Sequence, residues 1–188
     1  VTTNTVLGVS ALDANTTGAS NVAIGNSALT DLTSGGQNVA IGLESGFDTT
    51  TASNNTSVGF RSLKLNQTGT QNVAVGSFSL QANTADNNTA VGYVALLSNT
   101  TGIENVAVGA GALDANTTAN GNTAVGYVSL TANTTGSYNV AIGRFALNAN
   151  TTASNNTAVG NASLAFNTTG ANNTAHGFGA MYANTTGA

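Results

Sequence analysis

A five-residue motif, Asn-[Val/Thr]-[Ala/Val/Ser]-[Val/Ile/Leu]-Gly, recurs along the whole chain, and its spacing restricts the possible folds more than any other feature. Nine of the ten intervals between copies are 17 residues, and the interval between Gly76 and Gly92 is 16. In the last copy, His176 replaces the aliphatic residue before the glycine. The copies begin at Asn4, Asn21, Asn38, Asn55, Asn72, Asn88, Asn105, Asn122, Asn139, Asn156 and Asn173. Similar units along the whole length leave no room for separate domains, so residues 1–188 are expected to form one repeat domain, part of or a building block for a longer fibre.

The length and chemistry of this unit favour β structure. It is shorter than two-helix repeats, which span about 33 to 47 residues, and it is rich in Asn, Thr, Val and Gly, which are mediocre or poor helix formers. Before each motif glycine, Val, Ile or Thr alternates with Ala as in a strand. The later segment Ala-Asn-Thr-Thr-Gly is typical of turns. The sequence therefore predicts an all-β fold, a parallel β-solenoid or β-roll of about eleven 17-residue coils.

Stacking in register would place each coil about 4.8 Å from the next and give a rod roughly 50 Å long. The motif asparagines would then form a ladder whose amides bond from coil to coil. We expect three buried aliphatic side chains per coil, one of them the leucine four residues after the motif glycine. In the third coil Gly46 takes the leucine position, and Phe47 is expected to fill the gap. The shorter coil is expected to lose its residue in the turn at 81–84.

The alternation of Ala and Gly gives one face of each strand very little side-chain bulk, which lets another backbone approach closely. Two interpretations of this face remain open. It forms either a tight seam between copies of the chain or the inside of a thin single-chain roll whose two sheets lie close together.

The repeats resemble two groups of surface proteins. Asn-Val-Ala-Ile-Gly, as at Asn21–Gly25, resembles the head repeat of trimeric autotransporter adhesins, although that repeat is a few residues shorter. Asn-Thr-Ala-Val-Gly-Tyr, at Asn88–Tyr93 and Asn122–Tyr127, is more similar still to the repeat arrays of bacterial and phage tail-fibre-like proteins. The resemblance covers essentially the whole chain. It implies a left-handed β-roll, a homotrimer around one axis, and a role in attachment at an extracellular site, on a cell surface or in a virion-like fibre.

The composition argues against several classes of function. Only 5% of the residues are charged, and three Lys or Arg cannot neutralise a row of phosphates, so no nucleic-acid binding is expected. No apolar run approaches the 18 residues of a membrane-spanning helix, so no direct membrane insertion is expected. There is no cysteine, and the seven acidic residues are scattered over different positions of the repeat. The single histidine, His176, has no acidic residue near it in the sequence. We therefore expect no enzyme activity, no cofactor and no metal site.

Variation concentrates one and two positions after the motif glycine, where six of the ten aromatic residues lie. Aromatic and arginine side chains dominate recognition surfaces, so these positions are the candidate binding residues for a cell-surface glycan or a protein receptor. The alternative is that the rings pack on one another or across a trimer seam. The candidates are Phe60, Arg61, Phe78, Tyr93, Tyr127, Arg144, Phe145 and Phe178.

The recurring Asn-Thr-Thr admits two further interpretations. It matches the acceptor for N-glycosylation, but stacked sites a few ångströms apart are too close for every copy to carry a glycan, so turn chemistry is favoured. Threonine-rich solenoids also suggest ice binding. Because neighbouring residues on a strand point to opposite faces, we expect at most one outward threonine column, located in a turn. The acceptor asparagines are Asn15, Asn99, Asn116, Asn133, Asn150, Asn167 and Asn184.

These observations favour a structural or adhesive extracellular fibre segment, the shaft or head of a trimeric adhesin or tail-fibre-like protein. Such a rod would space or present a receptor-binding surface. The alternatives are a surface filament in which chains stack end to end and an ice-binding solenoid.

Overall fold

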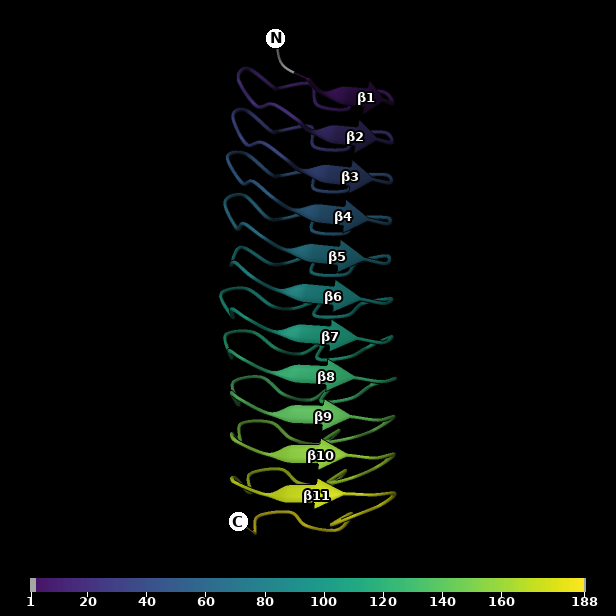
Figure 1. Cartoon of the computed structure of the whole chain (residues 1–188), viewed down its shortest axis with the longest axis vertical. Helices are drawn as coiled ribbons and strands as arrows, with labels where there is room; N and C mark the ends of the chain where they lie inside the picture. The colour runs from purple at the N-terminus through teal and green to yellow at the C-terminus, as the bar shows by residue number, and fades with distance from the viewer. Residues whose placement is uncertain (1–2, 188) are drawn as a thin grey trace.

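The computed structural model describes residues 3–187 as a stack of coils, each contributing one three-residue strand to a single parallel sheet (Figure 1). The strands pair in chain order, and the two termini lie at opposite ends of the stack. No helix occurs in these residues. The prediction of an all-β parallel solenoid is confirmed. The strands are β1 (Thr5–Leu7), β2 (Val22–Ile24), β3 (Val39–Ile41), β4 (Thr56–Val58), β5 (Val73–Val75), β6 (Thr89–Val91), β7 (Val106–Val108), β8 (Thr123–Val125), β9 (Val140–Ile142), β10 (Thr157–Val159) and β11 (Thr174–His176).

Each strand pairs with the next at the same position of the repeat. The shorter coil keeps this register, since Val73 of β5 lies beside Thr89 of β6, 16 residues further on. Thr84 Oγ1 donates to the carbonyl of Thr100, the bond that the first threonine of the pair makes in other coils. The missing residue is therefore the second threonine, and the deletion falls in the predicted turn.

The strands turn their small residues inward. From β2 to β11 the middle residue is buried, as Ala40 and Ala107 are, while the flanking residues face outward. The alanine face is thus the inside of one chain, so the seam between copies is wrong and the thin single-chain roll is correct. It has one sheet in place of two, because the opposite wall is built of turns.

The expectation of three buried aliphatic residues per coil is also wrong. The leucine after the motif glycine is fully buried, as Leu113 and Leu130 are, and it packs with the alanines in one core. The Val and Ile side chains of the strands are partly exposed, for example Val108 and Ile142. Among apolar residues, the interior of the coils holds Ala and Leu.

Left-handed residues return the chain after each strand. The motif glycine has φ between 121° and 140°, and the second and fourth residues after it, such as Ser27 (56°) and Leu29 (49°), are also left-handed. Leu29 N–H donates to the Ser45 carbonyl of the next coil at 3.0 Å, so this wall is hydrogen-bonded like a sheet. A left-handed L-residue costs roughly 1–2 kcal/mol, which coil-to-coil bonding and leucine burial offset.

The apolar core is interrupted at the third coil. One cluster runs from Leu12 to Ala40 and a second begins at Leu63, with Gly46 at the leucine position between them. Phe47 does not fill the gap as expected. It belongs to neither cluster and is half-buried, with the Lys64 ammonium 5.4 Å from its ring centroid.

Serine hydroxyls occupy the interior at this interruption. Ser45 Oγ donates to Ser57 Oγ at 2.8 Å and lies 3.1 Å from Ser62 Oγ, and all three residues are buried. Ser57 itself replaces the inward alanine of the other strands β2–β11. A polar layer therefore separates the two parts of the core.

The motif asparagines form the predicted ladder, called here the motif ladder. Asn122 Oδ1 accepts from the Asn139 backbone N–H at 2.9 Å, and Asn122 Nδ2 donates to the Gly136 carbonyl at 2.9 Å. Each amide thus ties its own coil to the next, and a buried amide left unpaired would cost about 1–3 kcal/mol. The ladder runs from Asn4 to Asn173.

A second ladder, the turn ladder, consists of the asparagines seven residues after the motif glycine. Asn116 Nδ2 donates to Asn99 Oδ1 at 2.8 Å and to the Ala119 carbonyl at 3.2 Å, and both asparagines are fully buried. Because the amide nitrogen that would carry a glycan is buried and hydrogen-bonded at Asn99, Asn116, Asn133, Asn150 and Asn167, the turn interpretation of Asn-Thr-Thr holds at these five positions. The ladder runs unbroken from Asn83 to Asn184.

The paired threonines divide into an engaged column and a free one. Thr117 Oγ1 donates to the Thr134 carbonyl, whereas the next residue, Thr118, is exposed. Thr135 and Thr152 are exposed in the same way. An outward threonine column therefore lies in a turn, as predicted. Threonines such as Thr89 and Thr123 also face outward on the sheet, so the expectation of at most one outward column is wrong.

Candidate binding surface

Two features of the exterior are candidates for recognition. The first is the edge of the rod just after each motif glycine, where the chain leaves its strand. The second is the outward face of the sheet. The surface formed by residues 3–187 has no pocket, so a ligand that binds to these residues would lie on an open surface.

The structure gathers seven of the eight predicted binding residues into two groups on the edge. Edge cluster A consists of Phe60, Arg61, Phe78 and Tyr93, and edge cluster B consists of Tyr127, Arg144 and Phe145. The eighth, Phe178, stands apart from both and is 85% exposed.

In edge cluster A the rings pack edge to face. The ring centroids of Phe60 and Phe78 are 5.0 Å apart, and those of Phe78 and Tyr93 are 6.3 Å apart. The Arg61 guanidinium lies 4.9 Å from the Phe60 centroid. The predicted alternative, that the rings pack on one another, is therefore correct for these three rings. Tyr93 nevertheless remains 59% exposed and accessible to a ligand.

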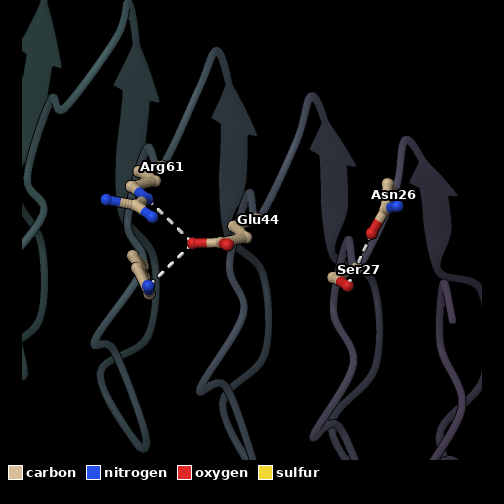
Figure 2. A network of polar contacts seen from close by, with 5 residues as sticks. Asn26, Ser27, Glu44 and Arg61 are labelled. Carbon is tan, nitrogen blue, oxygen red and sulfur yellow. Dashed lines mark hydrogen bonds and ion pairs between the residues drawn. The ribbon is translucent and has the colours of Figure 1, made fainter.

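The cation of edge cluster A is already paired. Arg61 Nε donates to Glu44 Oε2 at 2.8 Å, as Figure 2 shows, and Lys64 Nζ donates to the same oxygen at 2.7 Å. The Lys64 ammonium and then the Arg61 guanidinium, both hydrogen-bonded to Glu44, lower the pKa of its carboxyl. Close by, burial and then the charge of Asp31 raise the pKa of Asp48.

Edge cluster B has the same construction without the acid. The Tyr127 and Phe145 centroids are 5.9 Å apart, and the Arg144 guanidinium lies 4.1 Å from the Phe145 centroid and 6.0 Å from that of Tyr127. Arg144 is exposed, and Tyr127 is 54% exposed. Within residues 3–187 both ion pairs involve Glu44, and Arg144 takes part in neither.

The outward side of the sheet, here named the strand face, was not identified from the sequence. It is formed by the residues one and three positions before each motif glycine, which are Val, Ile, Leu or Thr apart from His176 in β11. Val108 and Ile142 are exposed, and no Asp, Glu, Lys or Arg interrupts the two columns. The signal was present in the sequence as the Val, Ile or Thr residues that alternate with Ala before the motif glycines.

The remaining chemistry of the described residues is sparse. Residues 3–187 contain no group of three or more His, Asp or Glu side chains placed to hold a metal ion. His176 is exposed at the end of β11, where its strand partner is Val159. Over the same residues there is no helix with the length and apolar character needed to cross a bilayer. No family model, no curated protein and no solved structure matches the chain significantly.

Proposed function

We propose that this chain is a segment of an extracellular fibre, the shaft or head of a trimeric adhesin or tail-fibre-like protein. Three copies would associate in parallel, wound left-handed as the resemblance implies, and the rod would space or present a receptor-binding surface at a cell surface or in a virion-like fibre. The single observation that carries this proposal is the uncharged strand face of β1–β10, in which a column of Val, Ile or Leu side chains runs beside a column of Val and Thr side chains.

The strand face has the properties of an interface. Extended apolar patches on a soluble protein mark sites of association, because their burial contributes about 25 cal/mol per Å². The side chains repeat in register from β2 to β10, so a second rod lying parallel would meet the same residue types along its whole length. Charge does not oppose this approach, since the two columns contain no Asp, Glu, Lys or Arg.

The ladders supply the mechanical property that a fibre needs. Every coil is tied to its neighbours by the strand, by the hydrogen-bonded turn wall and by the motif ladder. Bending the rod would have to lengthen several of these bonds at once, so the fold supports a stiff spacer. The edge clusters would then be the receptor-binding surface, displayed on the side of each rod.

Mass in solution tests the association. Sedimentation equilibrium of the chain at micromolar concentration should give three times its 18.4 kDa mass. Val108→Lys places one charge on the strand face and should reduce the mass to that of the monomer, whereas Thr118→Lys, on an exposed turn, should leave the trimer intact. Circular dichroism checks that both variants keep the β fold. A monomeric wild-type chain would overturn the proposal.

Electron microscopy separates the fibre segment from the end-to-end filament. Discrete rods of uniform length support the segment, and long unbranched fibres from the purified chain support the filament. The outward threonine column, with Thr118 and Thr135 among its members, is the observation that favours ice binding as a second candidate function. Absence of thermal hysteresis in solutions of the chain would remove that candidate.

A further inference from the structure

The charges of this chain are distributed unevenly, and one cation is left alone. Residues 115–188 contain no Asp or Glu, and Arg144 is their single Lys or Arg. The other two cations, Arg61 and Lys64, share Glu44. The chain has a formal net charge of −4. Within residues 3–187, Arg144 is the one Lys or Arg side chain without an ion pair, so the surface around it is the region best suited to bind an anion.

The Arg144 side chain is held by aromatic stacking alone. Its guanidinium lies 4.1 Å from the Phe145 centroid, and its side chain makes no hydrogen bond to another described residue. Stacking restricts the orientation of a guanidinium while leaving its in-plane N–H groups free, and those groups match the two oxygens of a carboxylate. The side chain therefore presents an exposed guanidinium without a protein partner, which a carboxylate can pair with.

The neighbouring coils supply the rest of a site. Tyr127, Arg144 and Asn161 occupy the same position of three consecutive coils, and all three are exposed. Their backbones are spaced by about 4.8 Å, so a ring face, a guanidinium and an amide follow one another along the edge. A ligand that matches this series has an apolar ring face, a carboxylate and hydroxyl groups.

We infer that Tyr127, Arg144 and Asn161, backed by Phe145, form a binding site for a sugar acid, a pyranose ring that carries a carboxylate. This inference deepens the proposed function and depends on it, because it names the ligand class of the receptor-binding surface. The carboxylate pairs with Arg144, the apolar face of the ring lies on Tyr127, and hydroxyl groups bond to the Asn161 amide. The site is shallow, so binding of one copy is weak and three parallel copies would strengthen it through avidity.

Edge cluster A contains, within the same chain, the arginine–carboxylate pair that such a ligand would form with Arg144. Arg61 also stacks on a phenylalanine, at 4.9 Å, but its Nε is bonded to the Glu44 carboxylate. Edge cluster B lacks that internal carboxylate, and an external one takes its place. Lys64 bonds the same Glu44 oxygen and lies outside both edge clusters, so Lys64→Gln is the charge-matched control for Arg144→Gln.

Titration calorimetry of the full chain against 3′-sialyllactose, trigalacturonate and neutral lactose tests the inference. At least one acidic sugar should bind at least tenfold more tightly than lactose, and its affinity should fall with added salt. Arg144→Gln should weaken acidic-sugar binding at least tenfold, while Lys64→Gln, which removes the same charge outside both edge clusters, should leave it within twofold of wild type. Preference for sialyllactose identifies a sialylated glycan as the source, and preference for trigalacturonate identifies a uronic-acid polymer.

Two outcomes would overturn the inference: equal binding of acidic and neutral sugars, or acidic-sugar binding that survives Arg144→Gln. Binding of neither acid would do the same. Sedimentation equilibrium of the same samples separates this failure from failure of the fibre proposal, because a chain that remains trimeric without binding a sugar acid keeps the fibre role and loses only this ligand.

Discussion

The coils that contain β6–β10 and those that contain β2–β4 share one backbone but differ in their interiors. In the first region every leucine position holds Leu and the turn ladder is continuous. In the second, Gly46 takes a leucine position, and Leu32 and Thr49 replace asparagines of the turn ladder. Asn15 Oδ1 and Asn66 Oδ1, at the two ends of this gap, are buried without a hydrogen-bond partner among the described residues.

The same irregular region carries half of the chain's ten charged residues. Arg61 and Lys64 bind Glu44 across the coil boundary at which the apolar core is interrupted. The comparison teaches that the backbone ladders fix the shape of a coil, whereas the side-chain columns fix how strongly it holds its neighbours. Surface charge accumulates where the interior columns are broken. The charged residues of the region are Asp31, Glu44, Asp48, Arg61 and Lys64.

Substitution of a motif glycine should have the largest effect and should not distinguish the two regions. A Cβ at Gly126 would lie 2.6 Å from the Gly143 carbonyl carbon, and one at Gly42 would lie 2.6 Å from the Gly59 carbonyl oxygen, both at φ near 135°. Gly126→Ala and Gly42→Ala should each lower the free energy of unfolding by at least about 3 kcal/mol. Urea denaturation measures both. A loss confined to one of the two variants would contradict a shared backbone requirement.

Truncation of the leucine column should separate the regions. Leu113 has leucine neighbours on both sides, so Leu113→Ala should cost about 3–5 kcal/mol. Leu29 faces Gly46 in the next coil, and Leu29→Ala should cost about 2 kcal/mol because fewer contacts are lost. Thermal and urea unfolding of the two variants provide the values. Equal losses would show that the interruption of the core does not weaken its neighbours.

The turn ladder offers a smaller contrast. Asn116→Ala removes three side-chain hydrogen bonds, two that Asn116 Nδ2 donates and one that its Oδ1 accepts from Asn133, and it leaves the buried Asn99 Oδ1 without its donor. A loss of about 1–3 kcal/mol is expected. Asn15→Ala should cost less than about 1 kcal/mol, since Asn15 Oδ1 has no partner to lose. Differential scanning calorimetry compares the two, and a larger loss for Asn15→Ala would oppose this description of the gap.

The effect of pH on the free energy of unfolding should be the smallest of these effects, and it should originate in the coils that contain β2–β4. Lys64 and Arg61 lower the pKa of Glu44 below its ordinary 4.5, so its ion pairs stabilise the fold above that pH and the contribution is lost as the pH falls further. Glu44→Gln should remove this contribution, which is about 1 kcal/mol or less for a partly exposed surface pair. Asp48 acts in the opposite direction, because its raised pKa favours the protonated form.

Unfolding in urea at pH 7 and pH 3 measures the change for wild type, Glu44→Gln and Glu104→Gln. Glu104 forms no ion pair in residues 3–187, so its variant should follow the wild-type pH dependence. A wild-type dependence that persists in Glu44→Gln would place its origin elsewhere.

Much of the fold could be predicted from the sequence because every ladder repeats at one spacing. The 17-residue period determined the strand register, and the small residues after the motif asparagines indicated a close approach of backbones. The period does not say which face of a strand is inside. Three buried aliphatic residues per coil were expected, whereas the left-handed Leu29 and its equivalents bring the opposite wall too close for inward Val or Ile side chains.

The candidate site was predicted in part for a similar reason. The aromatic residues were identifiable because they lie at the variable positions of an otherwise regular repeat. Their division into edge clusters A and B depends on which coils are adjacent and on the Glu44 contact, which sequence spacing alone did not specify. The strand face was missed because its Val and Ile side chains are as apolar as those of a core.

Native-state hydrogen exchange most directly tests the claim that side-chain columns set stability coil by coil. The Leu113 and Leu130 amides donate to Ser129 and Ala146 in the regular region, and the Leu29 and Gly46 amides make the equivalent bonds in the irregular one. We expect the second pair to open with a free energy about 1–2 kcal/mol lower and to exchange roughly tenfold faster. Equal protection of the two pairs, or slower exchange at Leu29 and Gly46, would contradict the account.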